Sequence, residues 1–85
     1  MQYHLSETLV KLYLENSDDL FDYAHYRVYD TEAAADLVQT VFLYACKSIA
    51  AIEPDYHRAW LYGIMKKLIH TYRRNQAHRK ELPLD

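Results

Sequence analysis

YHRAWLYGIMKKLIHTYRRNQAHR, residues 56–79, is the stretch around which the rest of the chain must be arranged. Read at helical spacing, it has an apolar stripe made of Leu61, Ile64, Met65, Leu68 and Tyr72. These positions recur at i, i+3, i+4, i+7 and i+11, the pattern of an amphipathic helix that packs on a core. We therefore expect a long helix here, with Trp60 at the margin of its stripe.

The face opposite this stripe carries Tyr62, Gly63, Lys66, Lys67, His70, Arg73 and Arg74, and its lysines and arginines hold much of the positive charge of the chain. A charged helix face is usually exposed to solvent and has no binding role. Here, however, residues 1–55 carry ten acids and three bases, whereas residues 56–85 carry seven bases and two acids. A basic final third in a chain of net charge −2 favours an acidic partner for that third, with nucleic acid as the first candidate.

Length and composition favour a single all-α domain over residues 1–85. A chain of 85 residues can build one modest core. A hydrophobic fraction of 51% excludes a disordered chain, and one glycine with two prolines leaves few breaks. The fold class that we expect is a compact bundle of three long helices, the first one broken.

Two N-cap signals predict the break in the first helix. Ser6 can cap a helix that runs to about residue 16. Ser17, followed by Asp18 and Asp19, has the pattern of a second N-cap with acids in the first turn. We therefore expect a break near Asn16 and a second segment that runs to about residue 29.

Asp30 or Thr31 is the expected cap of the next helix, which runs to about residue 49. Its apolar face comprises Ala34, Leu37, Val38, Val41, Phe42, Ala45 and Ile49. Its other face carries Asp36, Gln39, Thr40, Leu43 and Lys47. Leu43 is either an ordinary exposed leucine or the apolar centre of a small protein-binding patch, and its spacing fits both interpretations equally.

Pro54 ends the helical pattern before the basic helix, and residues 81–85 with Pro83 look like a frayed tail or the start of a linker. The N-terminus has no signal-peptide pattern, and no apolar run has the length of a membrane span. Cys46 is the only cysteine, so we expect a reduced, cytoplasmic setting with Cys46 as a small buried hydrophobic residue.

The sequence gives little support to catalysis. Its histidines are His4, His25, His57, His70 and His78, and none has HExxH spacing. Gly63 is the only glycine, so there is no glycine-rich phosphate loop. We expect no enzyme activity, no catalytic or metal-binding residues and no cofactor.

Three segments, in this order, resemble region 2 of the sigma-70 family, especially its extracytoplasmic-function group. They are LFDYA at residues 20–24, AADLVQTVFL at residues 34–43, and RAWLYGI at residues 58–64 followed by YRR at residues 72–74. The resemblance covers roughly residues 9–79. The DLVQ and AWLY motifs are fairly specific as a pair, about twenty residues apart.

The resemblance implies two binding surfaces. In this family the DLVQ helix binds the clamp coiled coil of the RNA polymerase β′ subunit, which here assigns polymerase binding to Asp36, Gln39, Thr40, Leu43 and Lys47. The last helix and the loop before it bind and melt the minus-ten promoter element on the non-template strand. The corresponding DNA-binding residues are Tyr56, His57, Arg58, Trp60, Tyr62, Lys66, Lys67, His70, Arg73 and Arg74.

The chain also departs from the family pattern. Lys67 and Thr71 stand where the family commonly has asparagine and aspartate, and Thr40 stands where it has glutamate. Region 4 follows in such sigma factors, and these 85 residues stop before it, so we expect either an excised region 2 domain or a stand-alone region 2 that works with a second polypeptide. We therefore keep a second function, that of a stand-alone co-sigma or regulatory module without base-specific DNA readout. Its further candidate partners are a separate region 4 polypeptide and an anti-sigma factor.

Overall fold

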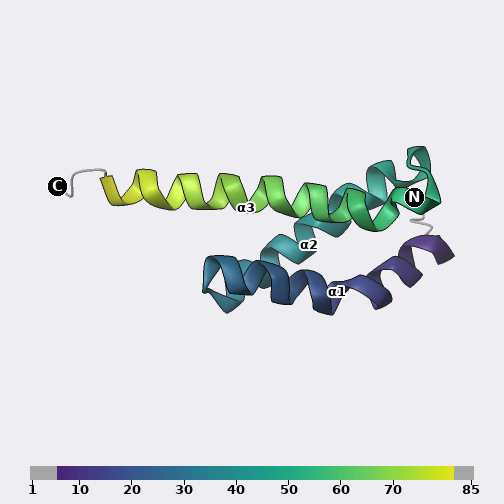
Figure 1. Ribbon diagram of the computed structural model, residues 1–85, viewed down its shortest axis with the longest axis horizontal. Coiled ribbons are helices and arrows are strands. Elements are labelled where there is room, and N and C mark those ends of the chain that lie inside the picture. Colours follow the sequence, from purple (N-terminus) through teal and green to yellow (C-terminus); the bar gives the residue numbers. More distant parts are fainter. Residues whose placement is uncertain (1–5, 82–85) are drawn as a thin grey trace, which may run out of the picture.

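Three helices make up the computed structural model, which describes residues 6–81, with side chains for residues 6–78. They are α1 (Glu7–Val28), α2 (Thr31–Ser48) and α3 (His57–Glu81), with short 3₁₀ turns at Ile49–Ala51 and Pro54–Tyr56 between α2 and α3. Figure 1 shows α1 and α2 joined by a tight turn, with α3 running past that turn at its C-terminal end. The expected all-α class with three long helices is confirmed.

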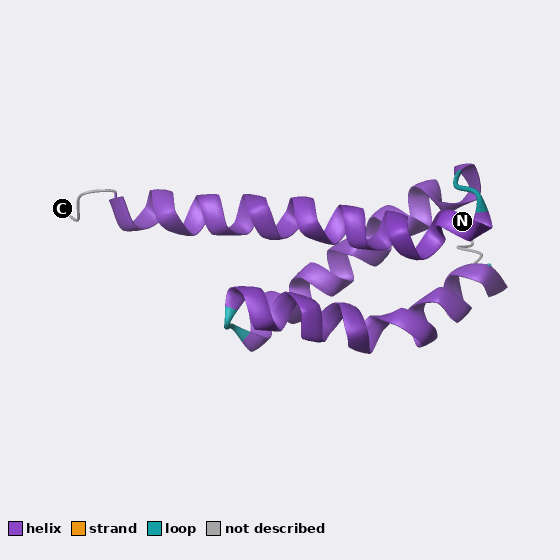
Figure 2. Cartoon of the chain, in the orientation of Figure 1, coloured by secondary structure: helices purple, strands orange, loops and turns teal. Residues whose placement is uncertain are grey.

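Two of the three predicted N-caps are present, at Ser6 and at Asp30. The Ser6 hydroxyl accepts a hydrogen bond from the Leu9 N–H at 3.1 Å, and the Asp30 carboxylate accepts one from the Ala33 N–H at 3.0 Å. Each bond satisfies a backbone donor that the helix itself leaves without a partner. Figure 2 shows how little loop remains between the helices.

The first helix differs from the expectation at Ser17. α1 is continuous in its secondary structure from Glu7 to Val28, so Ser17 is not an N-cap, and the break takes the form of a bend near the middle of the helix (Figure 1). Asn16 lies in that region and is buried, and its amide donates to the carbonyl of Leu12 at 3.0 Å. A side chain that bonds back to the i−4 carbonyl competes with the backbone ladder and often bends a helix.

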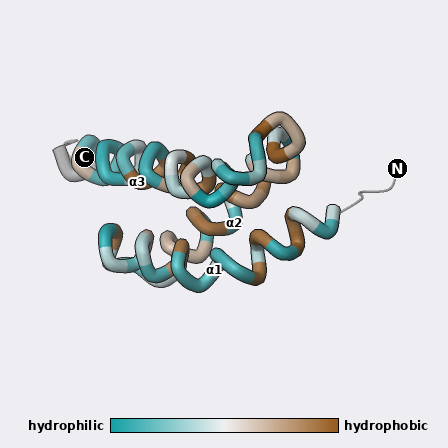
Figure 3. The backbone as a smooth tube through the Cα atoms, turned by 45° about the vertical axis from the view of Figure 1, so that its right-hand side comes forward, coloured by the Kyte–Doolittle hydropathy of each residue, from teal (hydrophilic) through white to brown (hydrophobic). Residues whose placement is uncertain are grey.

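The core lies where the three helices meet, and its fully buried side chains include Leu20, Val41, Leu61 and Met65. Figure 3 shows hydrophobic (brown) and hydrophilic (teal) stretches alternating along α1 and α2, as expected of amphipathic helices. On α3 the buried line is Leu61, Met65 and Ile69, whereas Ile64, Leu68 and Tyr72 are half-buried. This corrects the predicted stripe, which omitted Ile69. The core face is rotated toward the side of α3 that contacts α1.

Cys46 is exposed, which corrects the expectation that it is a buried hydrophobic residue. It lies on α2 beside Phe42, Leu9 and Tyr13, at the rim of a shallow apolar hollow. No helix within residues 6–81 combines the length and the apolarity needed to cross a lipid bilayer. Of the expected tail at residues 81–85, only Glu81 is described, as the last residue of α3.

Candidate functional site

The outer face of α2 carries an exposed leucine among polar side chains. The opposite side of this helix is anchored in the core by Ala34, Val38, Val41, Phe42 and Ala45. Because those positions fix the rotation of the helix, Asp36, Gln39, Leu43 and Lys47 all lie in solvent. Leu43 is 58% exposed. An apolar side chain with a polar rim is the composition of a small protein-binding patch.

Thr40, the fifth residue assigned to this face, is half-buried. Its hydroxyl donates to the carbonyl of Asp36 at 2.8 Å. The bond therefore stays within α2 and leaves the exposed side chains around Leu43 available to a partner.

The predicted basic face of α3 is divided between two sides of the helix. Lys66, His70 and Arg73 line a hollow shared with α1, whereas Lys67 lines a separate hollow shared with α2. Arg74 is exposed. The cations on α3 are thus accessible, but they do not form one surface.

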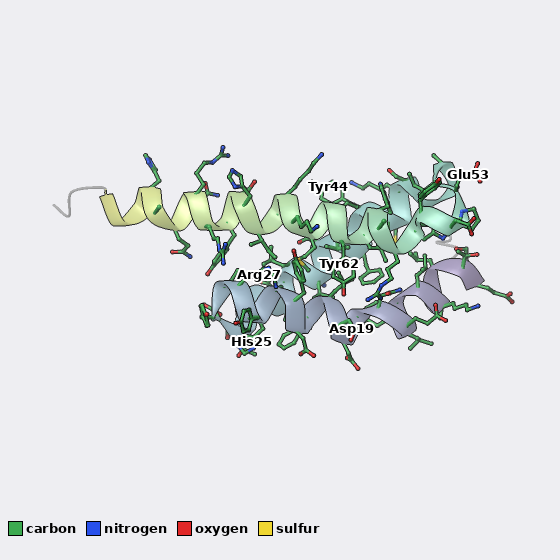
Figure 4. The ribbon with its side chains drawn as sticks, in the orientation of Figure 1. Asp19, His25, Arg27, Tyr44, Glu53 and Tyr62 are labelled. Atoms are coloured by element: carbon green, nitrogen blue, oxygen red, sulfur yellow. The ribbon has the colours of Figure 1, made fainter. Side chains whose placement is uncertain are left out.

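Two residues near the start of α3, Arg58 and Tyr62, have partners within the fold. The Arg58 guanidinium donates to the Asn16 side chain, lies 3.7 Å from the Asp19 carboxylate and packs over the Tyr62 ring at 5.0 Å. Tyr62 also meets Tyr23 of α1 edge to face, with ring centroids 5.2 Å apart. Figure 4 shows Tyr62 on the side of α3 that faces α1. These contacts hold α3 against α1.

The loop residues assigned to DNA differ in their accessibility. His57 is buried, and its Nε2 lies 2.9 Å from the carbonyl of Ile52, so the ring braces the loop between α2 and α3. Trp60 is half-buried against the core. Tyr56 is 64% exposed at the end of the second 3₁₀ turn. Among the aromatic and histidine candidates, Tyr56 therefore presents the most open ring.

The sequence-based assignment missed two residues of these surfaces, Arg27 and Tyr44. Arg27 lies on α1 and lines the same hollow as Lys66, His70 and Arg73. The sequence held a signal for it, because Arg27 is the only lysine or arginine between Asp18 and Glu32. Tyr44 on α2 is 49% exposed and lies beside Ile64, Lys67 and Leu68 of α3. Figure 4 labels both Arg27 and Tyr44.

The described residues include no group of three or more histidine, cysteine, aspartate or glutamate side chains placed to hold a metal ion. Within the same part of the chain, every buried side-chain nitrogen or oxygen has a hydrogen-bond partner.

The sequence matches one known protein family. A family model described as Sigma-70 region 2 matches residues 12–79 of the 85-residue chain. Neither the curated proteins nor the solved structures contain a match.

Proposed function

Since the chain belongs to the sigma-70 region 2 family, we propose that it acts in transcription initiation, binding RNA polymerase through α2 and promoter DNA through α3. In this proposal the outer face of α2 contacts the clamp coiled coil of the β′ subunit. α3 and the loop before it contact the non-template strand of the minus-ten element. The family match supports the general role, and the exposed residues support the two contacts.

The main observation in support of the polymerase contact is the environment of Leu43. It is 58% exposed, although α2 has a fully buried face that could have taken another apolar residue. Asp36, Gln39 and Lys47 surround it and are exposed as well. Burial of one such leucine at the centre of an interface contributes about 1.5–3 kcal/mol, while the rim fixes the orientation of the partner.

The DNA contact is supported by exposed cations and by one open aromatic ring. Lys66, Lys67, Arg73 and Arg74 can neutralise phosphates of an opened strand. Tyr56 offers a face on which an unstacked base can pack, worth about 1–3 kcal/mol for each stacked base.

The test of the polymerase contact replaces Leu43 with glutamate and Gln39 with alanine. The double variant should lose co-purification with core polymerase, because a carboxylate would have to be desolvated at the centre of the interface. Helical circular dichroism should not change, since both residues are exposed. Leu14→Glu is the matched control, because Leu14 is a 73% exposed leucine that belongs to α1 and not to α2. Polymerase binding that survives in the double variant would refute the contact.

A second candidate function is a regulatory module that binds polymerase without base-specific readout. It is favoured by Lys67 in place of the family's asparagine and by the internal contacts of His57, Arg58 and Tyr62. Binding to a melted promoter fragment, measured with and without core polymerase, separates the two functions. A sigma-type module should discriminate between minus-ten sequences in the polymerase complex, whereas a regulatory module should not.

A further inference from the structure

A concave surface between α1 and α3 brings cations from both helices together. Its inner part is lined by Tyr23, Arg27, Lys66, Ile69, His70 and Arg73. Its outer part shares Arg27 and Arg73 with the inner part and adds Tyr29 and Tyr72. We call the two parts the α1–α3 groove. Figure 4 shows Arg27 on the side of α1 that faces α3.

The positive charge of this groove is not neutralised by neighbouring acids. The one ion pair among the described side chains joins Arg58 to Asp19, outside the groove. Asp30 lines the outer part and keeps its negative charge while it caps α2, but Arg27, Lys66 and Arg73 outnumber it, so the groove is positive overall. A concave surface lined by cations concentrates the local field and attracts anions.

The two arginines are held in place by contacts that leave further donors available. The Arg27 guanidinium lies 3.4 Å from the centroid of the Tyr23 ring, and its Nη1 donates to the Tyr23 carbonyl at 3.0 Å. Arg73 donates through Nη2 to the carbonyl of Arg27 at 2.8 Å. Each guanidinium has five N–H donors, so both side chains retain donors for the oxygens of an anion. Their positions are fixed before any ligand arrives, which lowers the entropic cost of binding.

We propose that the α1–α3 groove binds backbone phosphates of a nucleic-acid single strand, with Arg27 of α1 as part of the site. The inference rests on the proposed DNA-binding function and extends the contact surface from α3 to α1. Tyr29 is 80% exposed at the outer part of the groove, and Tyr72 is half-buried there. Aromatic faces beside arginines suit a strand, because bases can stack while phosphates bind the cations.

The test is a titration of the 85-residue chain with hexathymidylate, followed by the backbone amide signals in NMR spectra. Shifts should cluster at Arg27, His70 and Arg73. Arg27→Ala should weaken binding about tenfold, the effect of losing one charge-assisted contact. Arg27→Lys should restore part of the affinity, because the charge remains. Lys11→Ala is the matched control, since Lys11 is a cation of α1 outside the groove. Circular dichroism verifies that each variant is folded.

Inorganic phosphate and thymidine triphosphate are titrated in parallel, to distinguish a strand from a free phosphate compound. The hexamer should bind more tightly than either, and raised salt should weaken it with a slope of about −0.7 per phosphate contact. Equal or tighter binding of the triphosphate would overturn the strand assignment. Wild-type affinity in Arg27→Ala, or no binding of millimolar hexamer, would overturn the groove itself. Polymerase binding through Leu43 is measured separately, so a failure of the groove is distinguishable from a failure of the proposed function.

Discussion

The surroundings of Gly63 in α3 show whether the structure requires a glycine at this position. It lies inside the helix, with a backbone conformation that any residue can adopt. A methyl group placed on its Cα would meet no other atom within 4 Å, apart from the helix's own neighbouring backbone. Neither the backbone nor the packing therefore requires glycine at this position.

We predict that Gly63→Ala stabilises the chain by about 0.5–1 kcal/mol, because glycine costs a helix interior that much relative to alanine. Urea unfolding followed by circular dichroism measures the change. An unchanged or lowered free energy of unfolding would contradict the open surroundings of Gly63.

Asn16 shows where reasoning from single residues fails. Ser17, Asp18 and Asp19 have the composition of a helix start, which predicts a break in α1 just before them. The buried Asn16 side chain accepts a hydrogen bond from Arg58, 42 positions away, a tertiary contact that no local pattern can show. Local patterns predict caps well only when no tertiary contact competes, as at Ser6 and Asp30.

At the scale of helices, the sequence predicts the face of α2 better than that of α3. α2 has one apolar side, so its outer residues follow from periodicity alone. α2 also contacts both other helices, but its buried residues all fall within the apolar face that periodicity predicts, whereas the buried Ile69 of α3 falls outside the predicted stripe. Periodicity therefore left out Ile69 and assigned Tyr62 to the free face. It also could not show that Lys66 and Lys67 line different hollows, or that Arg27 of α1 joins the first of them.

The C-terminal cap of α1 is a non-glycine residue in a conformation that favours glycine. Tyr29 closes the helix in the left-handed region, at φ 54° and ψ 35°, and its N–H donates to the carbonyl of His25 at 2.9 Å. Glycine adopts this conformation without the steric cost that a Cβ atom brings, and Tyr29 is 80% exposed, so little packing would be lost. We predict that Tyr29→Gly stabilises the chain by about 0.5–1 kcal/mol.

Thermal unfolding measures this change, and Tyr26→Gly is the control. Tyr26 is 73% exposed but lies inside α1, so glycine there should destabilise the chain. A loss of stability in Tyr29→Gly would mean that the tyrosine ring contributes more than its exposure indicates.

At the scale of the whole molecule, the two proposed surfaces differ in charge. Residues 1–55, which contain α1 and α2, hold ten of the twelve acids, whereas α3 holds most of the bases. The acidic part repels the phosphates that α3 attracts, and the net charge of −2 gives no general attraction to DNA. Polymerase bound to the outer face of α2 would cover part of the acidic surface and hold α3 beside an opened strand.

We therefore predict that the chain alone binds duplex promoter DNA weakly. Opening a duplex costs a few kcal/mol for each unstacked base. The exposed cations of α3 and the open rings of Tyr56 and Tyr29 cannot offset that cost over several base pairs. A fluorescence-anisotropy titration near physiological salt should give a dissociation constant well above micromolar for the duplex, and tighter binding once core polymerase is added. Sub-micromolar binding of duplex by the chain alone would show that α3 reaches DNA without polymerase. The acidic half would then have to be turned away from the duplex in the complex.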